Sequence, residues 1–417
     1  MNHQTRPAAD LVIENASELL TCAMGADDLV GRIPGGTVAI AGERILAAGT
    51  GSYVAEAVDR SQSRVINAAG RVVLPGFVDC HTHLVFGGSR VDEYAVRLTG
   101  GDLTGLAERG LPVGIVGTVD QTRDLGVDGL VESSLPRLDE MLHMGTTTAE
   151  SKSGYGLTTA SELRMLEVNH RLDGLQPVDV VSTFLGAHAF PPGVEADRYV
   201  DVVVDEMIPR VAEAKLAAFC DVYCEDGFFT VEQSRRVLEA GIAHGLRPKI
   251  HLDQYAHTGA ARIAADVRCA SADHLNFTGA AERRLLADAG VVGVAMPGLD
   301  FAVAHPRPVD IRALIDDGMT VALATDLCPG CWLTSMQFVI NLACRSHHLS
   351  VAEAVRASTL GPAAALGLVG EIGSLEPGKL ADIVILDIDR YEDLAYRLGR
   401  NAVETVIKRG KVVVERA

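Results

Sequence analysis

The sequence predicts an α/β fold, a (β/α)8 TIM-like barrel with a small β-sandwich domain formed from both ends of the chain. Three observations predict it. Eight short apolar or β-branched runs recur between residues 72 and 368, segments with helical periodicity alternate with them, and both chain ends contain strand-like segments separated by Gly or Pro turns. Alternating strands and helices indicate parallel strands joined by crossover helices, and eight such units form a barrel.

The expected barrel strands follow one another through the middle of the chain. They cover residues 72–80, 145–151, 178–188, 217–225, 247–254, 269–275, 291–298 and 320–327. Helical periodicity predicts helices over 131–144, 160–172, 204–216, 232–244 and 280–290. The stretch from 88 to 128, interrupted by Gly100-Gly101 and Gly110, is longer than an ordinary connection. We therefore expect it to form an extended loop over the site.

The two chain ends differ from the barrel pattern. Hairpin-like segments cover residues 10–21 and 36–49 before the barrel, and residues 373–388 and 402–415 after it. The ends of a compact domain lie at its surface, often close together, so these halves can pair. We expect residues 1–70 plus 369–417 to form the small β domain and residues 71–368 to form the barrel domain.

Composition and charge exclude several classes of function. At 417 residues, with 48% hydrophobic and 22% charged residues, the chain has the composition of an ordinary soluble protein. A formal net charge of -18 argues against binding to nucleic acid or anionic membranes. The sequence has no apolar run of 18 residues and no apolar N-terminal signal region, so we expect a cytoplasmic protein. Eight cysteines in so long a chain predict reduced, buried thiols.

Two histidines stand two residues apart at the end of the first apolar run. In a buried strand the side chains at i and i+2 face the same way, so the rings of His81 and His83 would converge. Converging neutral imidazoles suit a zinc-like cation, because each offers a nitrogen lone pair without a charge. A pair of core histidines bonded to the backbone is the alternative, and the motif alone does not decide between them.

Further polar residues stand at the ends of later predicted strands. His188 ends the third strand, His251 and Gln254 the fifth, His274 the sixth and Asp326 the eighth. Because barrel enzymes carry their sites at the carboxyl ends of the strands, five of the 13 histidines and one aspartate reach the same rim. Each histidine alone could be a satisfied core group, and the aspartate could begin a turn. Together they predict a metal site.

The same segments carry a family resemblance. The segment Pro75–Asp79 leading into His-x-His, with the later His, His and Asp, resembles the amidohydrolase superfamily. Within it, the imidazolonepropionase family of histidine degradation is similar to residues 145–156 (GTTTAESKSGYG), 183–189 (TFLGAHA), 271–275 (SADHL), 372–385 and 393–399. The similarity runs over nearly the whole chain.

The resemblance implies one divalent metal ion, zinc or iron. Its ligands would be His81, His83, His251 and Asp326. Three imidazoles and one carboxylate leave an open position for a water, whose pKa the ion lowers toward about 7. Many relatives carry a carboxylated lysine on strand four that bridges two metals, whereas strand four here ends in Cys-Glu. A single ion is therefore expected.

The resemblance also implies a reaction, the opening of 4-imidazolone-5-propionate to N-formimino-L-glutamate by hydrolysis of a ring amide C–N bond. Asp326 would take the proton of the water and pass it to the leaving nitrogen, while His274 orients the water or stabilises the oxyanion. Gln254 completes the expected catalytic set, and Gln254 and His188 would hydrogen-bond the ring amide.

The substrate-binding positions that the resemblance implies are Arg90, Tyr155, His188, Cys328, Gly330 and Cys331. An arginine fork suits the substrate carboxylate. Three departures remove polar partners of a propionate: Leu103 replaces a tyrosine, residues 111–114 (LPVG) replace a glycine triplet, and residues 328–331 (CPGC) replace Asn-Pro-Gly-Ser/Thr. The cysteine pair could also be a redox or zinc motif, although pocket lining is the expected role.

Two other functions stay open at this point. The same machinery could act on another five-membered cyclic amide, such as a hydantoin-like ring, or deaminate a heterocyclic amidine. The second open function is a structural or interaction role without catalysis. The converging ligands count against it. The expected partners are a small-molecule substrate and a second copy of the chain in a homodimer, with no nucleic acid and no membrane.

Overall fold

The computed structural model describes residues 6–109 and 111–416, and its largest sheet has the parallel strands that the sequence predicts. Their order in the sheet is β16-β15-β14-β13-β11-β10-β9-β8. The pairings from β10 to β16 are parallel. In chain order the strands are β8 (Phe77–Asp79), β9 (Thr146–Lys152), β10 (Asp179–Ala187), β11 (Phe219–Cys224), β13 (Ile250–Leu252), β14 (Ser271–His274), β15 (Val292–Ala295) and β16 (Val321–Leu323), and the short β12 (Arg247–Pro248) also pairs with β11.

Main-chain contacts beyond β8 and β16 bring the two edges of this sheet together. Thr82 and Leu327 form a parallel bridge. The N–H of His83 donates to the carbonyl oxygen of Leu327 over 2.8 Å, and the N–H of Asp326 donates to that of His81 over 3.1 Å. The eight strands thus form a nearly closed barrel, which confirms the predicted fold class.

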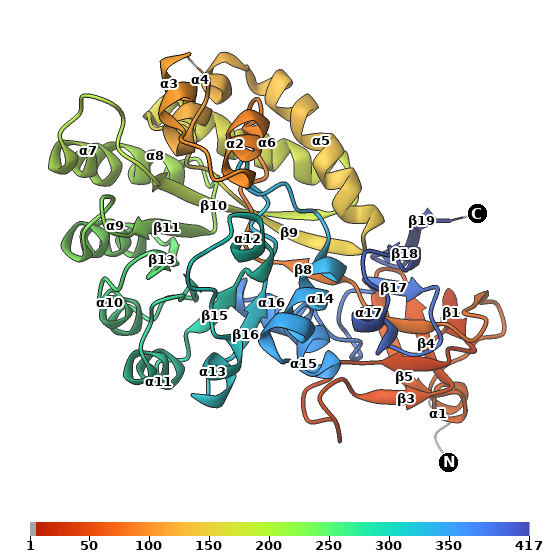
Figure 1. Cartoon of the computed structure of the whole chain (residues 1–417). Coiled ribbons are helices and arrows are strands. Elements are labelled where there is room, and N and C mark those ends of the chain that lie inside the picture. The colour runs from red at the N-terminus through yellow and green to blue at the C-terminus, as the bar shows by residue number, and fades with distance from the viewer. Residues whose placement is uncertain (1–5, 110, 417) are drawn as a thin grey trace. The chain divides into compact units, whose positions relative to one another are not determined.

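Helices connect the strands on the outside of the barrel, and Figure 1 shows α9, α10 and α11 in a row there. A capping box between Thr230 and Gln233 begins α9. The helices that follow the first barrel strands are α5 (Val127–His143), α6 (Thr159–Leu175), α7 (Ala196–Val202), α8 (Ile208–Glu213), α9 (Val231–Ala243), α10 (Ala261–Asp266), α11 (Ala280–Asp288), α12 (Pro297–Ala302) and α13 (Ile311–Asp316), with a π-helical turn at Val203–Met207. Later in the chain come α14 (Met336–His347), α15 (Val351–Arg356) and α16 (Leu360–Ala365). Within the described ranges, no helix has both the length and the apolar character needed to cross a membrane.

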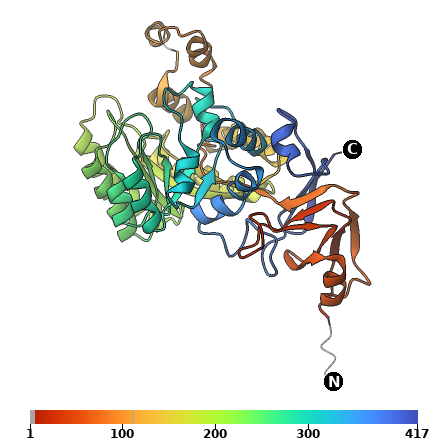
Figure 2. The ribbon, with the colours of Figure 1, turned by 60° about the horizontal axis from the view of Figure 1, so that its bottom comes forward.

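Residues 88–128 are largely helical, so the predicted extended loop is wrong. They contain α2 (Val91–Leu98), α3 (Thr104–Glu108) and α4 (Gly114–Asp124), which Figure 2 shows as a helical segment extending from the barrel. Gly100 has a φ of 66°, the left-handed conformation that commonly follows the last turn of a helix. This glycine therefore ends α2 instead of marking a long loop, while Gly110 lies outside the described residues.

The predicted first strand over residues 72–80 is also wrong, because two strands occupy it. The first, β7 (Val72–Pro75), pairs with β17 (Ile383–Leu386) and β2 (Glu18–Leu20), and only β8 enters the barrel. Gly76 separates β7 from β8, and a Cβ atom there would lie 2.3 Å from the hydroxyl oxygen of Thr147. One apolar run thus supplies two different sheets.

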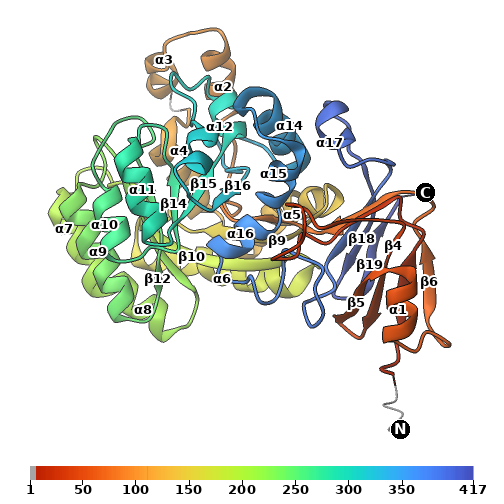
Figure 3. The same cartoon turned by 90° about the horizontal axis from the view of Figure 1, so that it is seen from below.

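The chain ends form two further sheets with a shared core. One has the order β5-β4-β1-β6 and the other β19-β18-β17-β7-β2-β3. Ile13 and Ile40 of the first pack in one buried cluster with Leu19, Ile383 and Ile407 of the second. The remaining elements are β1 (Leu11–Glu14), β3 (Arg32–Pro34), β4 (Gly36–Ala41), β5 (Arg44–Thr50), α1 (Gly51–Ala57), β6 (Arg64–Asn67), α17 (Asp393–Tyr396), β18 (Val403–Lys408) and β19 (Lys411–Glu415). Figure 3 shows α1 beside β4 and β5, and the arrangement agrees with the predicted β sandwich.

The contacts divide the chain into two compact units. One comprises Met1–Val78, Met141–Thr148 and Ser335–Ala417, and the other Asp79–Glu140 and Ala149–Thr334. All residues of the predicted site belong to the second unit. The domain borders at residues 70/71 and 368/369 stay a prediction.

Candidate metal centre and active site

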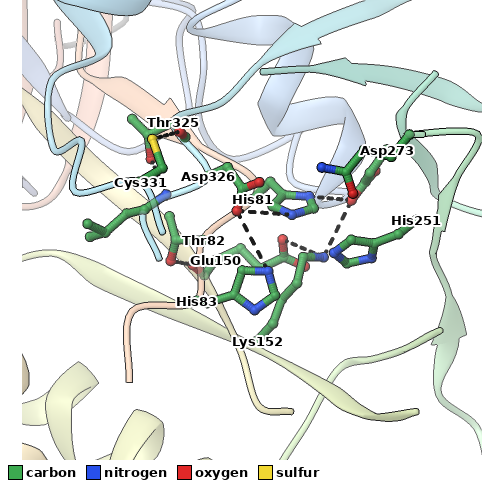
Figure 4. Close-up of polar contacts among 12 residues, drawn as sticks. His81, Thr82, His83, Glu150, Lys152, His251, Asp273, Thr325, Asp326 and Cys331 are labelled. Carbon is green, nitrogen blue, oxygen red and sulfur yellow. Dashed lines mark hydrogen bonds and ion pairs between the residues drawn. The ribbon is translucent and has the colours of Figure 1, made fainter. Parts of the chain in front are cut away.

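Four predicted ligands converge at the carboxyl ends of the barrel strands (Figure 4). The ring centroids of His81 and His251 are 4.5 Å apart, and those of His81 and His83 are 5.5 Å apart. One nitrogen atom of each of these three rings lies within 4.8 Å of the other two. The Oδ1 atom of Asp326 lies 3.7 Å from Nε2 of His81 and from Nε2 of His83. All four side chains are buried.

The backbone around Asp326 is held in an uncommon conformation. Its φ of 52° lies in the left-handed region, which few residues other than glycine adopt. The preceding Thr325 donates to the buried carboxyl group of Asp79 through its hydroxyl (2.5 Å) and its N–H (3.2 Å). These bonds and the contact to the carbonyl of His81 hold the turn against its strain, so the Asp326 carboxylate faces the histidines.

The electrostatics of the site leave its imidazoles neutral. Burial, reinforced by the nearby charge of Lys152, holds the pKa of His81 and of His251 well below the ordinary value. Burial, with the neighbouring histidines, does the same for the pKa of His83. Burial raises the pKa of Asp326 to about 7. Neutral rings offer lone pairs, which a cation requires of its ligands.

The donor atoms fit a divalent ion. Within the described part of the chain, no hydrogen-bond partner meets the buried atoms Nε2 of His81, Nε2 of His251 and Oδ1 of Asp326. Buried polar atoms without a partner are rare, because each costs about 1–3 kcal/mol. Nitrogen from neutral imidazoles together with one carboxylate oxygen is the donor set of catalytic zinc sites. The residues present therefore fit such an ion.

Two buried aspartates hold the outer nitrogens of two of these rings. Oδ2 of Asp273 lies 2.6 Å from Nδ1 of His81, and Oδ1 of Asp221 lies 3.1 Å from Nδ1 of His251. The ammonium group of Lys152 contacts both aspartates. Although burial opposes its charge, the surrounding carboxylates hold the pKa of Lys152 well above its ordinary value. A carboxylate on the outer nitrogen is the usual support of a metal-binding histidine.

The sequence patterns did not single out Lys152 or Asp221, and they gave Asp273 no role. A signal for them exists in the strand segments. Each is a charged residue within an apolar or β-branched run, as are Glu150 and Lys249, and such residues are seldom fully buried unless they are paired. Their partners stand on other strands, however, and a single strand does not reveal them.

His274 and His188 lie beside the converging ligands. The ring of His274 is centred 5.4 Å from that of His81, and burial lowers its pKa to about 3. The ring of His188 stacks on that of His83 at 4.8 Å, and burial lowers its pKa to about 4. Nδ1 of His188 lies 3.1 Å from the carbonyl oxygen of Gly154, which can only accept. His188 thus carries its proton on Nδ1 and presents Nε2 as an acceptor.

A buried carboxylate shapes the loop that carries Gly154 and Tyr155. The two carboxylate oxygens of Glu162 accept hydrogen bonds from the N–H groups of Gly154, Gly156 and Leu157, each over 2.8 Å. Burial raises the pKa of this carboxyl, and the side-chain hydrogen bond with Ser153 and the N–H donors oppose that rise. The loop is wrapped around Glu162 and holds Tyr155 in the cavity wall.

A cavity of about 280 Å³ opens above the converging ligands. Its size suits a small-molecule ligand. The predicted site residues that line it are His83, Arg90, Tyr155, His188, His251, Gln254, His274, Asp326, Cys328 and Gly330. The wall does not include His81, which lies fully buried, or Cys331.

The side chains predicted to hold the substrate differ in which hydrogen-bonding groups remain available to a ligand. Nη1 of Arg90 lies 3.6 Å from Oε2 of Glu93, and the buried Nε atom of Arg90 has no hydrogen-bond partner among the residues that the structure describes. The amide oxygen of Gln254 accepts a hydrogen bond from the hydroxyl of Tyr223 at 2.8 Å. Arg90 therefore offers a donor to the cavity, and Gln254 has its NH2 group left for a ligand.

The cysteine pair forms a tight turn with one thiol at the cavity. Cys328 and Cys331 exchange two backbone hydrogen bonds of 3.0 Å, and both are free thiols. The Sγ atom of Cys331 lies 4.0 Å from the carbonyl oxygen of Thr325 instead of in the cavity wall. Burial raises the pKa of Cys328 to about 12, so its thiol stays protonated. Among the described residues, the groups that could hold a metal ion include neither cysteine.

Comparison with known proteins identifies the family. Two models described as the amidohydrolase family match residues 236–413 and 64–127. The imidazolonepropionase of Shouchella clausii (strain KSM-K16) is 44% identical over 97% of this chain and 93% of its own length. That of Geobacillus kaustophilus (strain HTA426) is 46% identical over 98% and 94%. This chain belongs to the imidazolonepropionase family of amidohydrolases.

Solved structures share the fold of this imidazolonepropionase-family chain at low identity. An adenosine deaminase from Xanthomonas campestris with bound zinc has a TM-score of 0.73 and 20% identity, covering 99% of this chain and 94% of its own. The atrazine chlorohydrolase TrzN from Arthrobacter aurescens TC1, complexed with zinc, has a TM-score of 0.72 and 19% identity, covering 97% and 95%. The family and the converging donors together support a metal cofactor.

Proposed function

We propose that this chain hydrolyses 4-imidazolone-5-propionate to N-formimino-L-glutamate. The observation that carries the proposal is a set of buried nitrogen and oxygen atoms without a hydrogen-bond partner in the described structure, next to a small cavity, in a chain of the imidazolonepropionase family. One divalent ion, zinc or iron, would be held by His81, His83, His251 and Asp326. When bound, such an ion supplies Lewis-acid activation of a water molecule.

The protein's own groups move the protons of the reaction. Asp326 accepts a proton of the attacking water and delivers it to the ring nitrogen as the C–N bond breaks. His274 faces the same point and hydrogen-bonds the oxygen of the tetrahedral intermediate. Burial of both side chains excludes bulk water, and exclusion of water strengthens these interactions.

The cavity wall orients the substrate. Nε2 of His188 accepts a hydrogen bond from a ring N–H, because Nδ1 carries the proton of that histidine. The NH2 group of Gln254 donates to the ring carbonyl. The guanidinium of Arg90 binds the propionate carboxylate, and Tyr155 packs beside the ring.

A second candidate keeps the chemistry and changes the ring. Cys328 offers a thiol to the cavity, a weak donor, where the family pattern described above has an asparagine. This observation favours a hydrolase of a tailless five-membered cyclic amide, such as a hydantoin-like ring, or a deaminase of a heterocyclic amidine.

One experiment separates the two candidates. The wild type and Arg90→Ala would be assayed on imidazolone propionate and on hydantoins and amidines without a carboxylate tail. If the tailed ring is the substrate, Arg90→Ala should lower kcat/KM by about 10- to 150-fold, as for a lost charge-assisted hydrogen bond, and Cys328→Asn should raise it. The first candidate is contradicted if the wild type prefers a ring without a tail and Arg90→Ala does not change its activity on that ring.

Elemental analysis tests the metal site. Protein purified without chelator should carry about one zinc or iron per chain, as expected of an open four-ligand site. Two tightly bound ions would contradict the single-ion proposal. We also propose a homodimer in the cytoplasm that does not bind nucleic acid, which size-exclusion chromatography, cell fractionation and a nucleic-acid binding assay would check.

A further inference from the structure

A fully buried cluster of charged side chains lies beneath the proposed metal centre. The charge cluster consists of Glu150, Lys152, Asp221, Lys249 and Asp273, each with 0% exposure. Five ionisable groups in a core are costly unless each is paired, so their arrangement calls for a reason. Both lysines pair with Glu150, but of the two only Lys152 hydrogen-bonds the aspartates, and this difference separates their roles.

Lys152 hydrogen-bonds both of the aspartates that hold ligand rings. Its Nζ atom lies 2.7 Å from Oδ2 of Asp221 and 3.4 Å from Oδ2 of Asp273. These aspartates contact Nδ1 of His251 and Nδ1 of His81. One ammonium group is therefore linked to two ligand rings through two carboxylates.

Lys249 contacts neither aspartate in the described structure, and it meets Lys152 only through Glu150, whose Oε2 lies 3.0 Å from Nζ of Lys152. The Nζ atom of Lys249 lies 2.6 Å from Oε1 of Glu150 and 3.1 Å from the carbonyl oxygen of Cys80. It is as deeply buried as Lys152, and it carries the same charge in the same cluster. It therefore offers a matched control.

We infer that Lys152 is a positioning residue, which holds Asp221 and Asp273 as hydrogen-bond acceptors for the Nδ1–H groups of two ligand histidines. A carboxylate only accepts, so each ring must carry its proton on Nδ1 and turn the lone pair of Nε2 toward the ion. The inference rests on the metal centre proposed above.

Removal of the ammonium group would disturb both rings together. Asp221 and Asp273 share Lys152, and without it two buried like charges repel each other. Repulsion moves the carboxylates away from the ring nitrogens. Each ring is then free to carry its proton on Nε2, where the proton blocks the metal. A merely structural lysine would leave the ring tautomers unchanged.

The test compares metal-free wild type, Lys152→Met and Lys249→Met. Nitrogen-15 NMR of labelled histidine rings, assigned with single histidine variants, reports which ring nitrogen carries the proton. We expect Nδ1–H for His81 and His251 in the wild type and in Lys249→Met. In Lys152→Met at least one of the two rings should show Nε2–H.

Zinc affinity, measured by competition with a chelator, gives the second reading. Lys152→Met should bind zinc about 10- to 100-fold more weakly than the wild type, and Lys249→Met within about threefold of it, because of the two lysines only Lys152 hydrogen-bonds the aspartates behind the ligands. Equal losses in both variants would overturn the inference, as would a Lys152→Met protein with unchanged tautomers and affinity.

The wild type alone keeps the inference testable if Lys152→Met does not fold. An Nε2–H tautomer at His81 or His251 in the metal-free wild type would overturn it. A wild type with Nδ1–H at both rings that binds no zinc would instead refute the proposed metal centre, so the two failures are distinguishable.

Discussion

Replacement of Glu162 by glutamine tests whether the cavity wall depends on one buried carboxylate. Glu162 accepts three backbone hydrogen bonds from the loop Gly154–Leu157 through two oxygens. An amide has one oxygen, and its NH2 group only donates. In the better orientation the amide oxygen keeps the two N–H donors of Gly156 and Leu157, and the NH2 group faces the N–H of Gly154.

The magnitude follows from the bonds that are lost and weakened. Loss of one hydrogen bond to a charged acceptor costs about 1.5–3 kcal/mol. The two bonds that remain change from charge-assisted to neutral and lose about half their strength, which adds roughly 1 kcal/mol. We therefore expect Glu162→Gln to lower the free energy of unfolding by about 2.5–4 kcal/mol.

Activity should fall with stability, since the same loop serves the cavity. It places Tyr155 in the wall and supplies the carbonyl oxygen of Gly154 that holds the tautomer of His188. A displaced loop should lower kcat/KM on imidazolone propionate by at least about tenfold, as expected for misplaced binding groups.

The assay is urea unfolding followed by the fluorescence of Trp332, together with steady-state kinetics. Trp332 is the single tryptophan of the chain and lies in the same compact unit as Glu162, so it reports the unfolding of that unit. Glu167→Gln is the matched control, because Glu167 lies on the same helix and is exposed. If Glu162→Gln changes the free energy of unfolding and kcat/KM no more than Glu167→Gln does, the reasoning is refuted.

Three further outcomes are expected. Asp326→Asn should keep most of its metal while kcat falls by about 10²- to 10⁴-fold, and a variant with metal and near-wild-type kcat would move the proton transfer elsewhere. Arg137→Met should lower the free energy of unfolding in urea by about 2–4 kcal/mol, because the buried guanidinium donates to two carbonyl oxygens and stacks on Phe86; a change below about 0.5 kcal/mol would contradict this. The hydrogen bond to Glu282 raises the pKa of His257, so this pair should stabilise the fold below pH 6.5 and lose that contribution as the pH rises through the shifted pKa. His257→Gln should flatten this part of the stability profile, and an unchanged profile would contradict the assignment.

Local pattern was enough to predict the barrel and its main site. Strand-like runs that alternate with helical segments specify parallel strands, and the geometry of a barrel brings all carboxyl ends to one rim. His81, His251 and Asp326 could therefore be placed together from the sequence although their strands are far apart in the chain. The glycines between 88 and 128 misled the prediction, because a glycine that ends a helix and a glycine in a loop look alike in sequence.

The amino-acid sequence was enough to predict which side chains come together at the proposed metal centre, because strand direction and the two-residue period depend on neighbouring residues. The tertiary structure alone decided which atoms they present. The partner of Nδ1 of His81 is Asp273, 192 residues away, and Lys152 is 121 residues from that aspartate. Hydrogen bonds across the barrel hold Nδ1 of His81 and of His251, and no local pattern encodes such pairs, since they exist only once the strands have closed around a buried core.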